Sequence, residues 1–385
     1  MRQWKGMAAG ILLLTLCAAC RHKPAILPEE NYIAFVRQIL TAAYDEHPDP
    51  SVFTEAFDKQ AFAERIMAQG DIPEQQRPDV DRFLEEYFQP GKRMVARVDQ
   101  GADFQLIRFR MQHDTAIATF RIYNETITFE DWLMLADKKG SIRIIDITDP
   151  ISGMWWSDEW NMNACSYLDI TSDHFLINER LIAVNRLIGQ KDFARADSLF
   201  NWVEQATRNN LYARAMKLNL ISQSQPYDSL LKECSEFLQM FPGRTATTSF
   251  FCLQNAITNG LMPQVRKHCD ELGQAIGYDP IFFLYLAWGY KSSGDLESSL
   301  RMLDSLTAYI PVQYDFYNYK LDLYYDRKDA AGFVLQMDRI DSLFSASDED
   351  ISFYEQTYPE MRDRPEFKAW KERHLQKLAN EKSAL

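Results

Sequence analysis

Two acidic residues in the first half of the chain stand among apolar residues at the two-residue spacing of a β-strand. Asp131 and Asp146 each share a predicted strand face with apolar side chains: Ile127, Phe129, Leu133 and Leu135 around Asp131, and Ile142 and Ile144 around Asp146. Burial raises the pKa of a carboxyl group, and such a group can act as a general base. The alternatives are an acid at the end of a sheet that reaches solvent and a strand interrupted by a bulge. Asp131 and Asp146 are therefore candidate pocket residues.

No other combination of residues matches a known pattern for catalysis or metal binding. The sequence has no HExxH, GxSxG, P-loop or GxGxxG motif, and no CxxC or cysteine–histidine pair at zinc spacing. The six histidines are scattered along the chain, at His22, His47, His113, His174, His268 and His374. We therefore expect a protein that is not an enzyme and uses no metal or cofactor.

Four cysteines follow residue 20, at Cys165, Cys234, Cys252 and Cys269. An even number of cysteines in an exported protein permits disulfides. These four, however, lie among apolar residues at helical spacing, where a free cysteine behaves as a small hydrophobic residue. The sequence therefore favours buried thiols.

The first twenty residues combine a basic start with a short apolar run that ends at Cys20. The run covers residues 7–19 and is too short to span a bilayer. Its Ala-Ala-Cys ending resembles a bacterial lipobox, although Cys17 stands where that motif usually has leucine. The resemblance implies a signal peptide over residues 1–19, lipid on Cys20 and a tether over residues 20–29. It also implies a membrane-anchored lipoprotein of the cell envelope, on the periplasmic face or in the outer membrane. An ordinary cleaved signal peptide is the alternative.

The charge balance limits the kinds of partner. The formal net charge is −13, and loss of residues 1–19, which hold two basic and no acidic residues, would make it −15. This balance argues against nucleic acid as the main ligand, because binding a polyphosphate needs a concentrated basic face. A length of 385 residues with 46% hydrophobic residues allows two domains, each with its own core.

Residues 30–160 are predicted to form an α+β domain. Helical stripes over 31–47, 52–68 and 80–88 precede four segments with two-residue alternation, at 103–111, 115–124, 126–137 and 141–148. This order predicts helices packed on the apolar face of a four-stranded antiparallel sheet. The order and the last strand after Gly140 resemble an NTF2-like (cystatin-like cone) domain. The resemblance implies a conical pocket, and some such domains are enzymes that use a pocket acid, although a shared fold does not transfer activity.

Three tryptophans follow the last predicted strand, at Trp155, Trp156 and Trp160. Large aromatic side chains supply the most buried area per residue. We therefore expect this cluster to fill the seam between two domains, and an exposed patch that binds a partner is the alternative.

From residue 173 helical stripes replace the strand pattern, and turn-like segments recur at spacings of 34, 35, 34 and 34 residues. They are Gln190–Phe193, Gln225–Tyr227, Asn259–Met262, Ser293–Leu296 and Arg327–Ala330. The period resembles that of the tetratricopeptide (TPR) repeat, a helix–turn–helix unit, and Phe283, Leu286, Ala287 and Tyr290 stand where that motif has Trp, Leu, Gly and Tyr. About five repeats over 173–345 and capping helices over 346–385 are predicted.

Two positions in the second helix of each repeat are predicted to face the core of the array. The small position holds Ala196, Leu230, Val265, Ser299 and Phe333, and the large position, four residues later, holds Phe200, Cys234, Cys269, Leu303 and Met337.

The first helices of a TPR-like array line a concave surface that is suited to an extended peptide. The ninth position along the repeat holds Asn185, Asn219, Gln254, Trp288 and Asp322. Three consecutive amides can hydrogen-bond the backbone of a bound peptide, since each offers donors and an acceptor. Trp288 would stack, and Asp315, Asp322 and Asp326 would make the far end acidic. Ordinary exposed polar helix faces are the alternative.

Three kinds of function therefore compete. The first is a non-catalytic scaffold or adaptor that holds another protein or an extended peptide segment near the membrane. The second is a small-ligand binder or enzyme that uses the cone pocket of the N-terminal domain. The third is a purely structural subunit of an envelope assembly. We favour the scaffold, because the repeat pattern is the stronger signal.

Overall fold

The computed structural model describes residues 26–124, 126–170, 173–207, 210–311, 313–345 and 347–384. Cys20 and the lipobox-like segment lie outside these residues. The chain divides into two compact units between Lys217 and Leu218, inside the predicted repeat array. The predicted domain limits stay a prediction, and each unit is described by itself. In the described ranges, no helix has the length and apolar character needed to cross a membrane.

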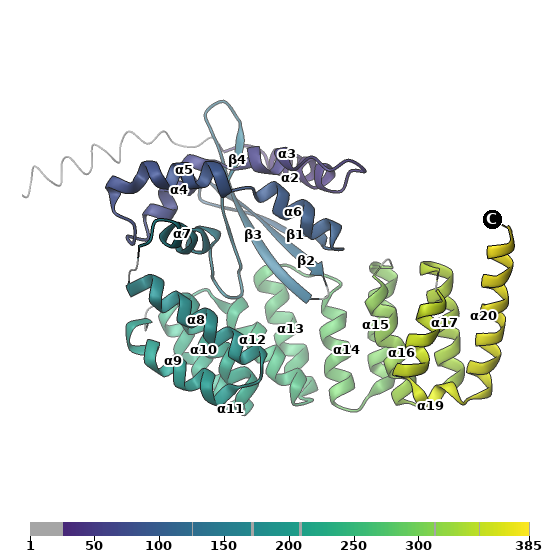
Figure 1. Cartoon of the computed structure of the whole chain (residues 1–385). Coiled ribbons are helices and arrows are strands. Elements are labelled where there is room, and N and C mark those ends of the chain that lie inside the picture. The colour runs from purple at the N-terminus through teal and green to yellow at the C-terminus, as the bar shows by residue number, and fades with distance from the viewer. Residues whose placement is uncertain are drawn as a thin grey trace, which may run out of the picture. The chain divides into compact units, whose positions relative to one another are not determined.

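The first unit contains a four-stranded antiparallel sheet with the strand order β1-β2-β3-β4 (Figure 1). Its strands are β1 (Asp103–Gln112), β2 (Thr115–Asn124), β3 (Thr126–Ala136) and β4 (Ile142–Thr148). Each strand end lies within one residue of its predicted position. The turn between β3 and β4 closes as expected, since Gly140 adopts φ 84° and donates its N–H to Asp137 O at 3.0 Å. The predicted meander is confirmed.

The helices of the N-terminal part differ from the prediction at two points. They are α2 (Glu29–Ala43), α3 (Pro50–Ala56), α4 (Lys59–Met67), a 3₁₀ turn (Glu74–Gln76), α5 (Arg77–Tyr87), α6 (Pro90–Asp99) and, after the sheet, α7 (Trp156–Tyr167). Helix is present over the predicted segment 52–68, but it forms two separate helices, α3 and α4. The Asp58 carboxylate caps α4 by accepting from Ala61 N at 3.0 Å, and Asp58 N donates to Ile144 O at 2.8 Å. This pairing with β4 separates α3 from α4.

Helix α6 was not predicted, because Pro90 suggests an interruption. Pro90 is instead the first residue of the helix, where a missing N–H costs nothing. Gly91 explains how the start of α6 packs closely on α3. A Cβ at Gly91 would lie 1.7 Å from Pro50 O, so only glycine fits there.

Aromatic rings fill the space between these helices and one face of the sheet. Ala116, Ala118, Phe120 and Ile122 are buried on that face. The Trp132 ring lies 4.3 Å from that of Phe120 and 4.9 Å from that of Phe53, measured between centroids. Phe57, Phe62 and Phe88 extend the cluster beneath the helices.

From residue 173 onward the described residues contain helices and no strand. Helices α8 (Asp173–Gly189) and α9 (Phe193–Thr207) belong to the first unit, and α10 (Leu211–Ser224) crosses the division. The second unit continues with α11 (Tyr227–Met240), α12 (Thr245–Thr258), α13 (Met262–Ile276), α14 (Phe282–Ser292), α15 (Leu296–Tyr309), α16 (Tyr314–Asp326) and α17 (Ala330–Phe344). In Figure 1 these helices follow one another as a row of antiparallel hairpins. The fold is therefore α+β followed by all-α, as predicted.

Four of the five helix pairs share a turn with a left-handed residue that repeats with the predicted period, whereas the turn between α10 and α11 contains Pro226 at φ −59°. Lys191, Gly260, Gly294 and Lys328 have φ values of 60°, 64°, 86° and 57°, and the last three are 34 residues apart. After this left-handed residue, the next N–H bonds back to a carbonyl five residues earlier, as from Asp295 to Tyr290 at 2.9 Å. All ten predicted core positions of the second helices are buried. The helix-pair register is thus confirmed.

Three further helices close the described C-terminal end of the second unit. They are α18 (Asp348–Thr357), α19 (Pro359–Arg362) and α20 (Pro365–Ala384). Tyr354, Tyr358, Phe367 and Trp370 pack with Phe333 and its neighbours in one buried cluster. The four cysteines of the described chain are free and buried, as predicted.

Candidate binding surfaces

The residues predicted to line the repeat surface occupy equivalent positions in the first helices. Asn219, Gln254, Trp288 and Asp322 are each half-buried, on α10, α12, α14 and α16. Each directly follows a fully buried residue: Leu218, Leu253, Ala287 and Leu321. Asn185 is exposed at the same position of α8, in the first unit. The period therefore places all five side chains at the edge of the core, where part of each remains accessible.

Hydrogen bonds and an ion pair within the repeat array engage some of the polar side chains in and near this row. The Asn219 Oδ1 atom accepts from Gln223 Nε2 at 2.9 Å. Asp322 accepts from the Tyr358 hydroxyl at 2.8 Å, and Asp326 pairs with Lys291 at 3.1 Å. The expected acidic end is thus partly engaged in contacts within the array.

Trp288 lies among other aromatic rings. Its ring meets those of Tyr285 and Tyr319 edge to face, with centroids 5.7 Å and 6.0 Å apart. These contacts hold the indole in place while leaving it half-exposed, so it can offer a fixed apolar surface.

Asp131 lies on the sheet face opposite the aromatic core. The register pairs it with Thr119 on β2, next to Trp132, which points into the core. Its carboxylate accepts from Arg110 Nη2 and from the Thr119 hydroxyl, both at 2.6 Å. This arrangement holds Asp131 in an ion pair on the second face of the sheet.

Asp146 is displaced from the face predicted for it. The register changes between Leu133 and Met134, so Met134 faces Ile144 while Leu133 faces Asp146. A bulge at Ile145 therefore turns Asp146 away from Ile144, which corrects the predicted shared face. The sequence allows for such a bulge but does not locate it, because a bulge depends on how the neighbouring strand pairs.

Fixed partners surround the Asp146 carboxylate. Arg65 Nε and the Ser157 hydroxyl donate to it at 2.7 Å each, and Ser157 N donates at 3.2 Å. Burial raises the pKa of Asp146, while the bonds from Ser157 and Arg65 oppose that rise. These contacts join β4 to α4 and α7, which is a structural role.

The three tryptophans that follow β4, Trp155, Trp156 and Trp160, do not pack together in one cluster. Trp156 stacks on Phe57 at 5.9 Å, and Trp160 meets Phe88 edge to face at 5.0 Å, so both belong to the N-terminal core. The predicted seam is therefore wrong for these two. Trp155 is half-buried under the Arg65 guanidinium and lines a hollow of about 260 Å³ with residues of α7, α8 and α10.

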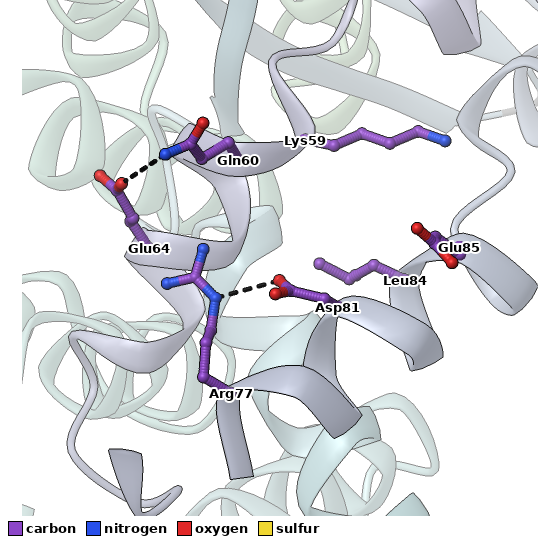
Figure 2. Close-up of a pocket in the computed structure, with 7 residues that line it drawn as sticks. All are labelled: Lys59, Gln60, Glu64, Arg77, Asp81, Leu84 and Glu85. Atoms are coloured by element: carbon purple, nitrogen blue, oxygen red, sulfur yellow. Dashed lines mark hydrogen bonds and ion pairs between the residues drawn. The ribbon is translucent and has the colours of Figure 1, made fainter. Parts of the chain in front are cut away.

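A polar hollow of about 560 Å³ opens between α4 and α5 (Figure 2). Its lining residues are Lys59, Gln60, Glu64, Arg77, Asp81, Leu84 and Glu85. Arg77 pairs with Asp81 at 3.0 Å, and Gln60 donates to Glu64 at 3.4 Å. Both signs of charge lie in this hollow, and Figure 2 shows pairing within each helix wall.

A groove of different character lies in the second unit, with a volume of about 490 Å³. Its walls are formed by helix α13, the connection after it, the start of α14 and the end of α15. The lining residues are Arg266, Cys269, Asp270, Tyr278, Asp279, Pro280, Phe282, Phe283, Leu286 and Tyr309. We call it the aromatic groove. Tyr278 and Tyr309 on its rim are 63% and 67% exposed, an unusual setting for large rings in water. No sequence pattern indicated this groove, since its residues come from separate helices.

Comparisons with known proteins add little to these observations. No protein-family model matches the chain, and no curated protein matches it. Among solved structures, the chain is similar to one described as "MamA RS-1 ArsTM double mutant", with 11% identity and a TM-score of 0.33. That similarity covers 44% of this chain and 97% of the other. We therefore base the functional proposal on the residues of this chain.

Proposed function

We propose that this protein is a non-catalytic, lipid-anchored scaffold of the cell envelope, which binds another protein or an extended peptide through its TPR-like helix pairs. The observation that supports it is the row of half-buried side chains at one repeated position of the first helices, Asn219, Gln254, Trp288 and Asp322. Such a surface suits an extended partner, because accessible side chains recur at a regular step along the array: two amides, then an indole and a carboxylate.

The anchor is the part of the proposal that rests on sequence alone. The Ala-Ala-Cys ending at Cys20 supports it. Several acyl chains on one cysteine would hold the protein firmly to a membrane, whereas a single chain would hold it marginally. We place the protein on the periplasmic face or in the outer membrane.

A small-ligand or enzymatic role of the N-terminal part is not favoured by the side chains seen there. Aromatic rings fill the interior between helices and sheet, and Asp131 and Asp146 are held in ion pairs.

The test is a comparison of partners recovered with the native protein and with surface variants. Cross-linking in membranes, followed by purification of the full chain, identifies the candidates, and each is then titrated against purified variants. Changing Asn219 and Gln254 together to Ala should weaken binding by about one to two orders of magnitude, since each amide contributes about 0.5–1.5 kcal/mol. Trp288→Ala should cost more than any single amide, because buried aromatic residues dominate interfaces.

Leu335→Ala is the matched control. Leu335 is 70% exposed on a second helix, α17, and its truncation should leave binding unchanged. A folded Asn219/Gln254 double variant that binds every recovered partner as the native protein does would refute this surface as the binding site.

A further inference from the structure

The aromatic groove shares no residue with the row of first-helix positions, so it calls for its own explanation. We propose that it is a second docking site, which takes a peptide segment carrying an apolar side chain beside an acidic one. The apolar side chain fills the groove between Tyr278, Phe283 and Tyr309, and the acidic side chain pairs with Arg266 at the rim.

The residue types at the rim are those that carry binding energy in protein interfaces. Tyrosine and arginine are enriched among interface residues whose truncation is most costly. A tyrosine ring offers a large contact area with few rotatable bonds, so little conformational entropy is lost on binding. Tyr278 and Tyr309 present such rings to solvent, and Cys269 and Phe282 provide a buried apolar floor.

Tyr278 is held in its place before any partner arrives. A Cβ on Gly273 would lie 2.6 Å from two atoms of the Tyr278 ring, so the ring lies flat on α13 only because residue 273 is glycine. The Tyr278 hydroxyl donates to Asp270 at 2.6 Å, which fixes the far end of the ring. A wall that is ordered in advance loses less entropy when it binds.

The opposite wall is ordered by stacking. The rings of Phe283 and Tyr309 lie nearly parallel, at 14°, with centroids 6.1 Å apart. The two residues come from α14 and from the last position of α15. The groove is thus preformed on both sides, and its width is set by two neighbouring helix pairs.

The charged residues that line the aromatic groove determine which peptide segment it can bind. Two carboxylates also line the groove, and both already accept hydrogen bonds. Asp270 accepts from Tyr278 and from Gln274 Nε2, the latter at 2.7 Å, and buried Asp279 accepts from Ile281 N at 2.7 Å. Arg266 bonds the Tyr290 hydroxyl and lies over the Tyr290 ring, and within the described residues it has no carboxylate at ion-pair distance. The neighbouring Lys267 is instead paired, with Glu271 at 3.7 Å. The Arg266 guanidinium at the rim therefore favours an acidic side chain on the partner peptide.

Two matched peptides test the proposal with the full chain. The probes are N-acetyl-Ala-Leu-Glu-Phe-Ala-amide and the same peptide with Gln in place of Glu, measured by ligand-observed NMR titration. The first should bind more tightly by up to about fivefold, since an exposed ion pair contributes up to about 1 kcal/mol. Arg266→Gln should abolish that preference, and Arg266→Lys should retain most of it.

Substitutions in and near the groove walls distinguish the contribution of apolar contacts to peptide affinity from that of the ion pair. Tyr309→Ala should weaken both peptides by about tenfold, because it removes a rim ring. Lys267→Gln should change neither affinity. Leu335→Ala, at an exposed residue of α17 that does not line the groove, should also change neither.

Equal affinity of the native protein for both peptides, or a preference that survives Arg266→Gln in a folded variant, would overturn the assignment of Arg266. Binding of octanoate at the groove without binding of either peptide would overturn the peptide as its occupant, and so would binding of neither probe.

Discussion

At the scale of single residues, His268 links three helices through hydrogen bonds. Its Nε2 lies 2.5 Å from the Tyr227 hydroxyl and its Nδ1 lies 2.8 Å from Glu271 Oε2. The Ser249 hydroxyl donates to the same Glu271 oxygen at 3.1 Å. Burial lowers the pKa of His268, and the bond to Glu271 opposes that change only in part. His268 is therefore held in its neutral form inside the second unit.

This lowered pKa predicts a pH-dependent stability. A histidine whose pKa is lower in the folded state contributes fully above its unfolded value, near pH 6.5, and that contribution is lost as the pH falls toward the folded value. We expect His268 to reduce the unfolding free energy by up to about 1.4 kcal/mol per pH unit in this window. Urea unfolding at pH 7.5, 6.0 and 5.0 measures it.

His268→Gln should flatten that slope, and His47→Gln, at an exposed histidine, should leave it unchanged. A slope identical in the native protein and in His268→Gln would show that another group is responsible.

Asp146 gives a second prediction at this scale. Replacement by Asn keeps the shape but removes the charge that Arg65 and the two Ser157 donors share. We expect a loss of about 1–3 kcal/mol of unfolding free energy, the range for hydrogen bonds to a charged group. Asp81→Asn, in an exposed pair with Arg77, should cost less than about 1 kcal/mol. Urea unfolding compares the two, and equal losses would contradict a joining role of Asp146.

At the scale of elements, the turns between paired helices carry the repeat. Gly260 and Gly294 both have positive φ, which strains any residue with a side chain. A Cβ at Gly294 would meet nothing within 4 Å, whereas one at Gly260 would lie 2.9 Å from Ser292 O. Gly294→Ala should therefore cost about 1–2 kcal/mol from backbone strain alone, and Gly260→Ala should cost more.

The melting temperatures of these two variants, measured by circular dichroism at 222 nm, test the expected order of their stabilities. Gly189→Ala is the matched control, because Gly189 has neither a positive φ nor a close neighbour. A melting temperature of Gly260→Ala equal to that of Gly294→Ala would contradict the close approach to Ser292.

At the scale of the whole molecule, the proposed function depends on the anchor. Cys20→Ser should release the protein from the membrane fraction and abolish labelling by a palmitate analogue, because the acylated thiol is lost. Cys17→Ser is the matched control and should change neither. A Cys20→Ser protein that still labels and still sediments with membranes would disprove the anchor.

The sequence by itself determined what depends on local periodicity. Two-residue alternation located each strand to within one residue, and the 34-residue period located the turns at Lys191, Gly260, Gly294 and Lys328. Ten core positions of the second helices were also predicted correctly. Burial of one face and the conformation of a turn are properties of a short stretch of chain, so a single sequence records them.

Only the tertiary structure decided features that need a second segment. Pairing with β4 separated α3 from α4, and the register with β3 moved Asp146 to the other face. Packing on Phe57 and Phe88 assigned Trp156 and Trp160 to the N-terminal core. The aromatic groove joins α13, α14 and the end of α15. Such contacts depend on which distant residues meet in space, and helical or strand spacing alone carries no record of those partners.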